Sequence, residues 1–150
     1  MGGCLACELS SGERELPGGR ICATEHLVVE HCVGPLGLGT LIVKPLRHVE
    51  HLWDLSAEEA AELGPLLIRV ADAQRELLQP EQVYMTLWSH AGGVSGHLHR
   101  VLQPVGAERP RGLFGPHLQV AMFDADVHPP GSEVAALAHR FRERLVGPGA

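Results

Sequence analysis

One long helix between segments rich in β-branched residues limits the folds open to this chain. Ser56 can cap the helix, and Glu59, three residues later, can reach back to it as a capping box. Apolar side chains then recur at helical spacing as far as residue 79, and Pro80 ends the helix. Because strand-like segments lie on both sides of this helix, the order of elements indicates an α+β fold.

Five segments are predicted to be strands. Residues 20–29 and 40–44 are rich in β-branched and apolar side chains, and the Gly/Pro loop between them predicts an antiparallel pair. After the long helix, residues 82–88, 97–103 and 118–123 are predicted as strands, and Ser132 begins a C-terminal helix that runs to about Leu145. The whole is an α+β fold with a mainly antiparallel five-stranded sheet, one long central helix and a C-terminal helix.

Length and composition restrict the class of protein. A chain of 150 residues with ordinary globular composition predicts one domain over residues 1–150. No apolar run approaches the roughly 20 residues of a membrane span and no export signal is visible, so a cytoplasmic location is expected. The 12 basic residues are outnumbered by 18 acidic ones and are mostly scattered, which argues against extended contact with nucleic acid.

The densest chemical signal is a glycine-rich loop followed by the predicted strand 97–103. Successive side chains in a strand alternate between its faces, so His97, His99 and Val101 are expected on one side. A neutral imidazole can attack an electrophilic phosphorus or carbonyl, and it can also bind a metal ion. The spacing of the two histidines alone leaves both chemistries open, together with histidines that only pack or meet water.

Cys4 and Cys7 have the C-x-x-C spacing with which one short turn supplies two thiolates, half of a tetrahedral zinc site. Cysteines of a chain without an export signal stay reduced, which favours a metal site over disulfides. A redox pair is expected to follow a strand and begin a helix, whereas this pair precedes every predicted strand. The spacing therefore favours a zinc knuckle over about residues 1–20.

Three further segments occur in a recognisable order. Residues 45–48 read Pro-Leu-Arg-His, residues 54–59 read Asp-Leu-Ser-Ala-Glu-Glu, and residues 91–104 hold the glycine-rich loop, the H-x-H pair and Pro104. In this order and spacing, the chain resembles the histidine triad (HIT) superfamily of nucleotide hydrolases and transferases. The resemblance covers about residues 4–104 and leaves the C-terminal segment 106–150 less constrained.

The resemblance implies a HIT-like fold and a homodimer whose subunit sheets join edge to edge. His99 matches the family's nucleophile, which attacks a phosphorus centre of a nucleotide conjugate and forms a covalent nucleotidyl-histidine. The third histidine of the triad matches Val101, which offers no hydrogen-bond donor to the phosphate and its departing group. Loss of one such donor commonly costs about 10²-fold or more in rate.

Candidate substrate-binding residues also follow from the resemblance. Cys32 stands where the family has an acidic or amide residue for the ribose hydroxyls, and Gly93 stands where it has a glutamine. From the residues themselves, Ser95 and the amides of the Gly92–Gly93 loop are candidates to face an anion, although such loops also serve as plain turns. Trp88 could stack on a base, although a tryptophan at the end of a strand is more often simply packed.

Some bacterial members of the family combine a C-x-x-C motif with two histidines, which here implies a site of Cys4, Cys7, His48 and His97. Four protein ligands leave no open position for substrate, so the zinc ion would be structural. His51, one helical turn from His48, is the rival ligand.

Three functions are compatible with these residues. The first is a phosphoric anhydride or phosphoramidate hydrolase or transferase that acts on a nucleotide or phosphate conjugate through His99. The second is a zinc-stabilised binding or interaction protein of HIT fold without catalysis. The third is a recruited biosynthetic hydrolase with a non-standard substrate. The sequence leaves specialised substrate and lost activity as open alternatives.

Overall fold

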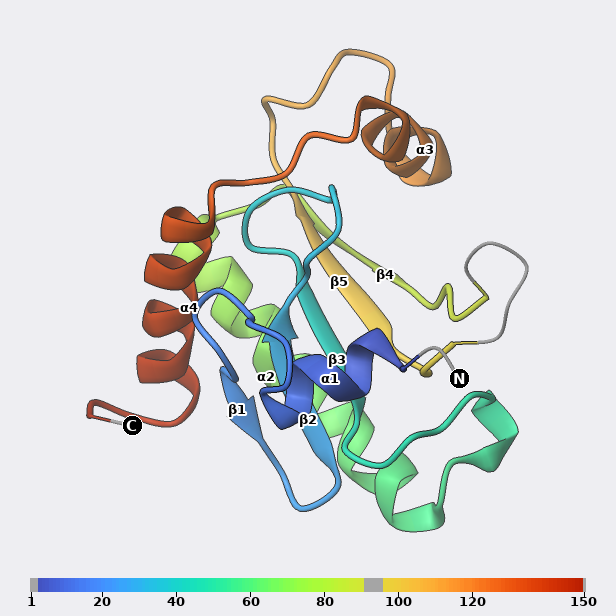
Figure 1. The fold of residues 1–150 in the computed structure, drawn as a ribbon. Helices are drawn as coiled ribbons and strands as arrows, with labels where there is room; N and C mark the ends of the chain where they lie inside the picture. The colour runs from blue at the N-terminus through green and yellow to red at the C-terminus, as the bar shows by residue number, and fades with distance from the viewer. Residues whose placement is uncertain (1–2, 91–95, 150) are drawn as a thin grey trace.

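An antiparallel sheet forms the centre of the protein (Figure 1). The structure, a computed structural model, describes residues 3–90 and 96–149. Its strands are β1 (Cys22–Ala23), β2 (Leu27–His31), β3 (Leu41–Pro45), β4 (Gln82–Thr86) and β5 (Arg100–Val105). Its helices are α1 (Leu5–Ser11), α2 (Ala57–Leu78), α3 (Gly115–Ala125) and α4 (Gly131–Leu145), with a short 3-10 helix, η1 (Leu52–Asp54), before α2. The strand order β1-β2-β3-β5-β4, antiparallel throughout, confirms the predicted α+β class with a five-stranded sheet.

The antiparallel pair predicted before the long helix is present as β2 and β3. His31 at the end of β2 pairs with Leu41 at the start of β3. The loop between them closes through a 2.8 Å bond from the N–H of Cys32 to the carbonyl of Thr40. Gly39 in this loop has a φ of +87°, and a side chain there would collide with Leu78. The Gly/Pro loop between β2 and β3 therefore fixes how these two strands are joined.

The central helix α2 begins at the predicted capping box. The Glu59 N–H donates to Ser56 Oγ at 3.1 Å, and the Glu59 carboxylate accepts from the Ser56 N–H at 2.8 Å. Arg47 donates to the same carboxylate, which is buried. The helix ends at Leu78, and Gln79 follows in the left-handed conformation with a φ of +50°.

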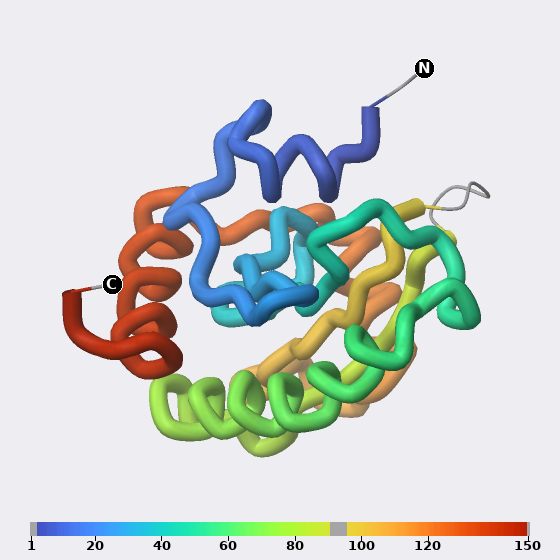
Figure 2. Tube along the Cα trace, turned by 90° about the horizontal axis from the view of Figure 1, so that it is seen from below, coloured from blue at the N-terminus to red at the C-terminus, as the bar shows by residue number. Residues whose placement is uncertain are grey.

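The hydrophobic core lies between one face of the sheet and helices α2 and α4 (Figure 2). Alternate residues of β2 and β3 point into it, and α4 contributes Phe141, which is fully buried. Packing one long and one C-terminal helix on a sheet is the two-layer arrangement expected of an α+β domain. The buried cluster consists of Ile21, Cys22, Leu27, Val29, Leu41, Val43, Leu66, Val70, Ala73, Leu102, Leu137, Ala138, Phe141 and Leu145.

The prediction of a strand over 118–123 is wrong, because these residues belong to helix α3. Leu118 and Gln119 are buried, whereas Val120 is 57% and Phe123 49% exposed. A short run with apolar residues on all sides has no clear period, so its pattern does not separate helix from strand. Pro116 in the first turn is the helix signal that was missed.

The sheet nevertheless has five strands because residues 20–29 do not form one strand. They divide into β1 and the beginning of β2 around a turn at residues 24–26, where the Thr24 N–H donates to the carbonyl of Leu27 at 2.9 Å. Strand β5 begins at Arg100, three residues later than predicted, so His97 and His99 precede it.

Helices α1 and α2 lie on opposite sides of the sheet (Figure 2). On the side of α1, Lys44 of β3 donates to a backbone carbonyl of that helix. On the same face, Gln119 of α3 donates to Gln103 of β5 at 3.0 Å. None of the helices that the structure describes is both long enough and apolar enough to cross a membrane.

Candidate functional site

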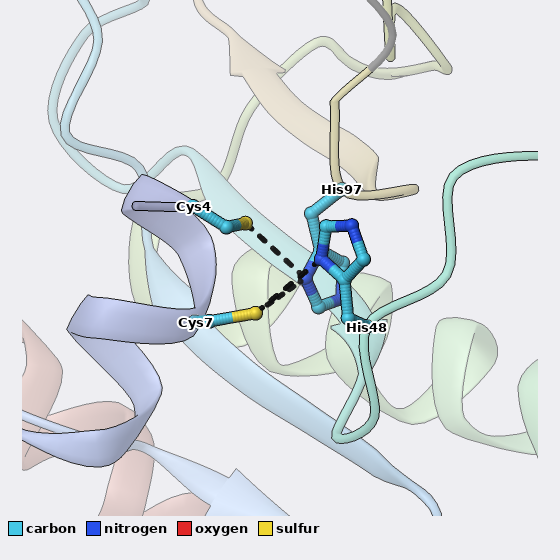
Figure 3. A group of neighbouring side chains, drawn as sticks. All are labelled: Cys4, Cys7, His48 and His97. Atoms are coloured by element: carbon cyan, nitrogen blue, oxygen red, sulfur yellow. Dashed lines mark hydrogen bonds between the residues drawn. The ribbon is translucent and has the colours of Figure 1, made fainter. Parts of the chain in front are cut away.

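Two cysteines and two histidines from three separate segments meet beside the sheet (Figure 3). Cys4 and Cys7 belong to the start of α1, His48 follows β3, and His97 precedes β5. The Cys7 Sγ atom lies 3.5 Å from His48 Nδ1 and 3.4 Å from His97 Nδ1, and Cys4 Sγ lies 3.8 Å from His97 Nδ1. We call these four side chains the Cys2His2 cluster; their ligand atoms all lie within 4.8 Å of one another.

Each imidazole of the cluster is oriented by a second hydrogen bond. The Nε2–H of His97 donates to the carbonyl of Pro45 at 2.9 Å, because a carbonyl can only accept. Nδ1 of the neutral ring then carries the lone pair and faces the thiols. The Nε2 atom of His48 lies 3.3 Å from the carboxylate of Glu50. Such carbonyl and carboxylate partners are the usual support of metal-binding histidines.

Protonation within the cluster follows from burial and neighbouring charge. Burial lowers the pKa of His97 to about 4, and the nearby Lys44 and His48 add to this effect, so this ring is neutral at physiological pH. The hydrogen bond that His48 donates to the Glu50 carboxylate raises the pKa of His48. Burial opposes ionisation of Cys4, but the N–H and thiol of Cys7 lower the pKa of Cys4 below its ordinary value. Burial and the Cys4 thiol raise the pKa of Cys7.

The spacing of the four donor atoms fits a tetrahedral metal ion. Bonds of about 2.3 Å to sulfur and about 2.0–2.1 Å to nitrogen at the tetrahedral angle put the two kinds of donor about 3.6 Å apart. Three of the four sulfur-to-nitrogen pairs of the cluster, Cys7 with each histidine and Cys4 with His97, are 3.4–3.8 Å apart, and all four donor atoms lie within 4.8 Å of one another. The Cys2His2 cluster could therefore hold a metal ion. His51, the rival residue, is directed elsewhere: its ring stacks on Trp53 at 4.7 Å and its Nδ1 contacts Asp54.

His99 follows the cluster residue His97 by two positions in the sequence, and it is half-buried. Its Nδ1–H donates to the carbonyl of His97 at 2.8 Å. In the neutral ring this leaves the lone pair on Nε2, which is the form of imidazole that can act as a nucleophile. Leu98 between the two histidines is fully buried, and its N–H donates to the carbonyl of Val49 at 2.6 Å.

Val101, which takes the place of the third histidine, is built into the sheet. It pairs with Ile42 on β3 and with Thr86 on β4. Its side chain is 4% exposed. The position thus supplies an apolar surface two residues beyond His99, without a hydrogen-bond donor.

The four predicted substrate-binding residues have different outcomes. The Cys32 thiol accepts from the N–H of Gly34 at 3.3 Å, and burial raises the pKa of this thiol. The indole N–H of Trp88 donates to Gln119 of α3 at 3.2 Å, while the ring remains 57% exposed. Gly93 and Ser95 lie outside the residues that the structure describes.

One pair of charged residues near the cluster was not predicted from the sequence. Lys44 and Glu30 form a 2.6 Å ion pair, and both side chains are almost completely buried. The signal was present, because each is the charged residue in an otherwise apolar strand segment and the two charges are opposite. Their pairing depends on strand register, which sequence inspection did not supply.

His26 is a second histidine whose surroundings the sequence did not reveal. Its ring contacts the Glu62 carboxylate of α2 at 2.7 Å, and Thr24 also donates to that carboxylate. Glu25, His26 and Glu62 form the second group of close acidic and histidine side chains in the described part of the chain. The hydrogen bonds from Thr24 and His26 to the Glu62 carboxylate fasten the turn between β1 and β2 to helix α2.

Comparison with solved structures identifies the fold of the chain. No protein-family model and no curated protein sequence matches the chain. Among solved structures, a zinc-bound histidine triad family protein from Mycobacterium smegmatis is 21% identical, with a TM-score of 0.70 over 95% of this chain and 94% of that one. A hypothetical histidine triad nucleotide-binding protein from Sulfolobus tokodaii is 19% identical, with a TM-score of 0.72 over 97% and 98%. A HIT family protein from Bacillus subtilis is 18% identical, with a TM-score of 0.62 over 97% and 99%. The chain therefore has the fold of the histidine triad proteins.

Proposed function

We propose that this protein is a hydrolase or transferase of nucleotide conjugates that acts through His99, and that the Cys2His2 cluster holds a structural zinc ion. The observation that carries the catalytic part is the 2.8 Å bond from His99 Nδ1–H to the carbonyl of His97. This bond orients the ring and leaves Nε2 free to attack. The nucleotide-binding protein from Sulfolobus tokodaii, similar in fold, supports a nucleotide as part of the substrate.

The reaction has two steps at phosphorus. The Nε2 lone pair of His99 forms a bond to the phosphorus atom while the bond to the leaving group breaks, and the leaving group takes up a proton from water. Water or another acceptor then attacks the same phosphorus, loses a proton to solvent and breaks the bond to Nε2. His99 returns to its neutral state, so atoms and charge balance over the cycle.

The zinc part of the proposal rests on the donor set. Two thiols and two imidazoles whose ligand atoms lie within 4.8 Å of one another suit Zn²⁺, and four protein ligands leave no position for substrate. When bound, the ion supplies a cross-link between α1, the turn after β3 and the segment before β5. A zinc-bound protein of the same fold supports this choice of metal. Thiolate ligands require a reducing compartment, so a cytoplasmic location belongs to the same proposal.

Val101 favours a second candidate, a binding protein of this fold that has lost catalysis. The valine has no donor for the charge that develops on the phosphoryl oxygens and the leaving group. Neutral Cys32 likewise lacks the negative charge of a carboxylate that could accept from ribose hydroxyls. The same two residues also suit an enzyme with a non-standard substrate.

Turnover of a small substrate panel decides between these candidates. Adenosine and guanosine phosphoramidates and dinucleoside polyphosphates are incubated with the wild type, with His99→Ala and with His139→Ala, which removes an exposed imidazole from α4. His99→Ala is expected to lose at least about 10³-fold in kcat and His139→Ala to keep the activity. The wild type should also show a nucleotidyl mass adduct on the peptide that contains His99.

Two outcomes contradict the catalytic proposal. Activity of more than a few per cent in His99→Ala would mean that another group is the nucleophile. Tight nucleotide binding by the wild type without turnover or adduct would establish the binding protein instead. Neither outcome affects the zinc proposal, which metal analysis tests separately.

A homodimer joined through β4 is also part of the proposal. Strand β4 is one edge of the sheet and is five residues long, whereas the other edge, β1, has two residues. Met85 on β4 is 59% exposed, and Ile68 on the neighbouring helix α2 is 73% exposed. An exposed edge strand with apolar side chains is suited to pairing with a second copy. Sedimentation equilibrium should find a dimer, and Met85→Lys should shift it toward the monomer.

A further inference from the structure

A buried ion pair lies beneath the helix that carries the two cysteines. Lys44 Nζ and Glu30 Oε2 are 2.6 Å apart, and their side chains are 2% and 3% exposed. The pair occupies neighbouring strands, β3 and β2, on the face of the sheet that α1 covers. Burial of two charges costs free energy that an apolar pair at the same positions would not. The groups that the pair contacts can offset this cost.

Both members of the pair bind α1 directly. Lys44 Nζ donates to the carbonyl of Ala6 at 2.8 Å, and Ser10 Oγ donates to Glu30 Oε1 at 2.9 Å. Ala6 lies between Cys4 and Cys7 in the chain. The contact from Lys44 therefore fixes the backbone turn from which both thiols project.

Helix α1 is half-buried over residues 6–10 and exposed at Leu5 and Ser11. It is seven residues long, and none of its residues is buried. A helix this short is not stable by itself and depends on tertiary contacts. The strands supply such contacts through Lys44 and Glu30, while the Cys2His2 cluster supplies others at the beginning of the helix.

We propose that Lys44 and Glu30 are positioning residues for metal binding: they dock α1 so that the thiols of Cys4 and Cys7 face His48 and His97. This inference rests on the metal site of the proposed function and adds to it residues that are not ligands. Residues that orient the ligands of a metal typically contribute about 10- to 100-fold to its affinity.

Metal affinity tests the inference directly. Purified, reduced protein is titrated with Co²⁺, whose absorption reports thiolate ligation, and Zn²⁺ affinity is then measured by competition with a chelator. Lys44→Met is expected to bind both ions about 10- to 100-fold more weakly than the wild type. Arg69→Met is the matched control, because Arg69 donates to one carbonyl, that of Leu145, and touches neither α1 nor the cluster. The control should bind as the wild type does.

A double variant separates positioning from the cost of an unpaired charge. Lys44→Met alone leaves the Glu30 carboxylate buried without its charged partner, which destabilises the folded protein apart from any effect on metal binding. Combining Lys44→Met with Glu30→Met removes both charges, so the midpoint of thermal unfolding of the metal-free protein should recover. Metal affinity should stay low, because the carbonyl of Ala6 still lacks the hydrogen bond from Lys44. Recovery of affinity together with the midpoint would overturn the inference.

Binding linkage provides a second, independent measurement. If docking of α1 favours the metal, the metal must favour docking to the same extent. Lys44 is the one lysine of the chain, so acetylation at a lysine reports the exposure of this residue alone. Zn²⁺ should slow acetylation of Lys44 in the wild type and have no effect in Cys4→Ser. Equal rates with and without bound Zn²⁺ in the wild type would contradict the inference.

Metal binding by the wild type and by Lys44→Met distinguishes failure of the metal site from failure of the role given to Lys44 and Glu30. Absence of Co²⁺ and Zn²⁺ binding by the wild type would overturn the metal site, and this inference with it. Tight binding by the wild type together with unchanged affinity in Lys44→Met would leave the metal site standing and overturn only the role of Lys44 and Glu30.

Discussion

Helices α4 and α1 lie against the same sheet, but they are held there in different ways. Helix α4 has 15 residues and buries five apolar side chains, from Val134 to Leu145. Helix α1 has seven residues and buries none. The first is fixed by non-directional burial of apolar area, and the second by an ion pair, hydrogen bonds and the Cys2His2 cluster.

The difference separates a helix that stabilises the fold, α4, from a helix whose attachment depends on protonation and on bound metal, α1. Apolar burial needs no partner of particular geometry, so α4 stays in place whenever the sheet is formed. The contacts of α1 are directional and involve groups whose charge state and metal occupancy can change. We therefore expect substitutions under α4 to affect global stability, and changes around α1 to act mainly on metal binding.

The largest expected effect is that of Phe141→Ala in α4. Phe141 is fully buried, and truncation of a buried phenylalanine typically costs about 3–5 kcal/mol. Chemical denaturation of the metal-free protein measures this loss. The matched control is Phe123→Ala on α3, where the ring is 49% exposed and the change should stay within about 1 kcal/mol. Similar losses in the two variants would show that apolar burial under α4 does not dominate stability.

Removal of metal should have the next largest effect. A ligand present at 100 times its Kd stabilises the folded state by about 2.7 kcal/mol, and chelation should remove that amount. Cys4→Ser should lack bound zinc and show no response to the chelator in thermal unfolding. Cys22→Ala, which removes a buried thiol that is not part of the cluster, should keep the response. Full zinc occupancy in Cys4→Ser would contradict the ligand assignment.

A smaller effect is expected where a helix is secured by its own first turn. Ser56→Ala removes the side chain that accepts from the Glu59 N–H at the start of α2. Loss of such a cap costs about 1 kcal/mol. Ser132→Ala is the control, because Ser132 lies in the first turn of α4 and no side chain caps that helix. If both variants lose the same amount in denaturant titrations, the capping box contributes nothing specific.

The smallest expected effect is a pH dependence from His26. The bond to Glu62 raises the pKa of His26 above 6.5 in the folded state. Because the folded pKa is the higher one, this contribution to stability is complete below pH 6.5 and is lost as pH rises through the folded value. The thermal midpoint of the wild type should exceed that of His26→Gln by more at pH 6 than at pH 8.

His117→Gln, which removes an exposed imidazole from α3, is the matched control for loss of a histidine. A difference between the wild type and His26→Gln that grows toward pH 8 would mean that the ion pair with Glu62 does not raise the pKa of His26. Neither residue belongs to the Cys2His2 cluster, so both variants keep its four side chains.

Prediction from sequence succeeded where short-range interactions decide the structure. The capping box of Ser56 and Glu59 lies within four residues and is present. The hairpin of β2 and β3 was predicted from two segments rich in β-branched residues and the Gly/Pro loop between them, and it is present. In contrast, α3 was predicted as a strand, because residues 118–123 are apolar on both the buried and the exposed side.

The candidate site was predicted in part. The approach of Cys4, Cys7, His48 and His97 was expected from the resemblance to histidine triad proteins, and these side chains do lie together. The pairing of Lys44 with Glu30 was not expected, although both charges stand out in apolar strands. Their contact depends on strand register and on a helix that packs from the other end of the chain.

By itself, the sequence determined the α+β class, the start and end of the long helix and the hairpin before it. These features depend on periodicity, turn residues and bonds between residues a few positions apart. The tertiary structure decided that His48 rather than His51 joins the cluster, that Val101 is buried in the sheet, and that a buried ion pair underlies α1. Cys4 and His97 are 93 residues apart, so only packing of the whole sheet brings them together.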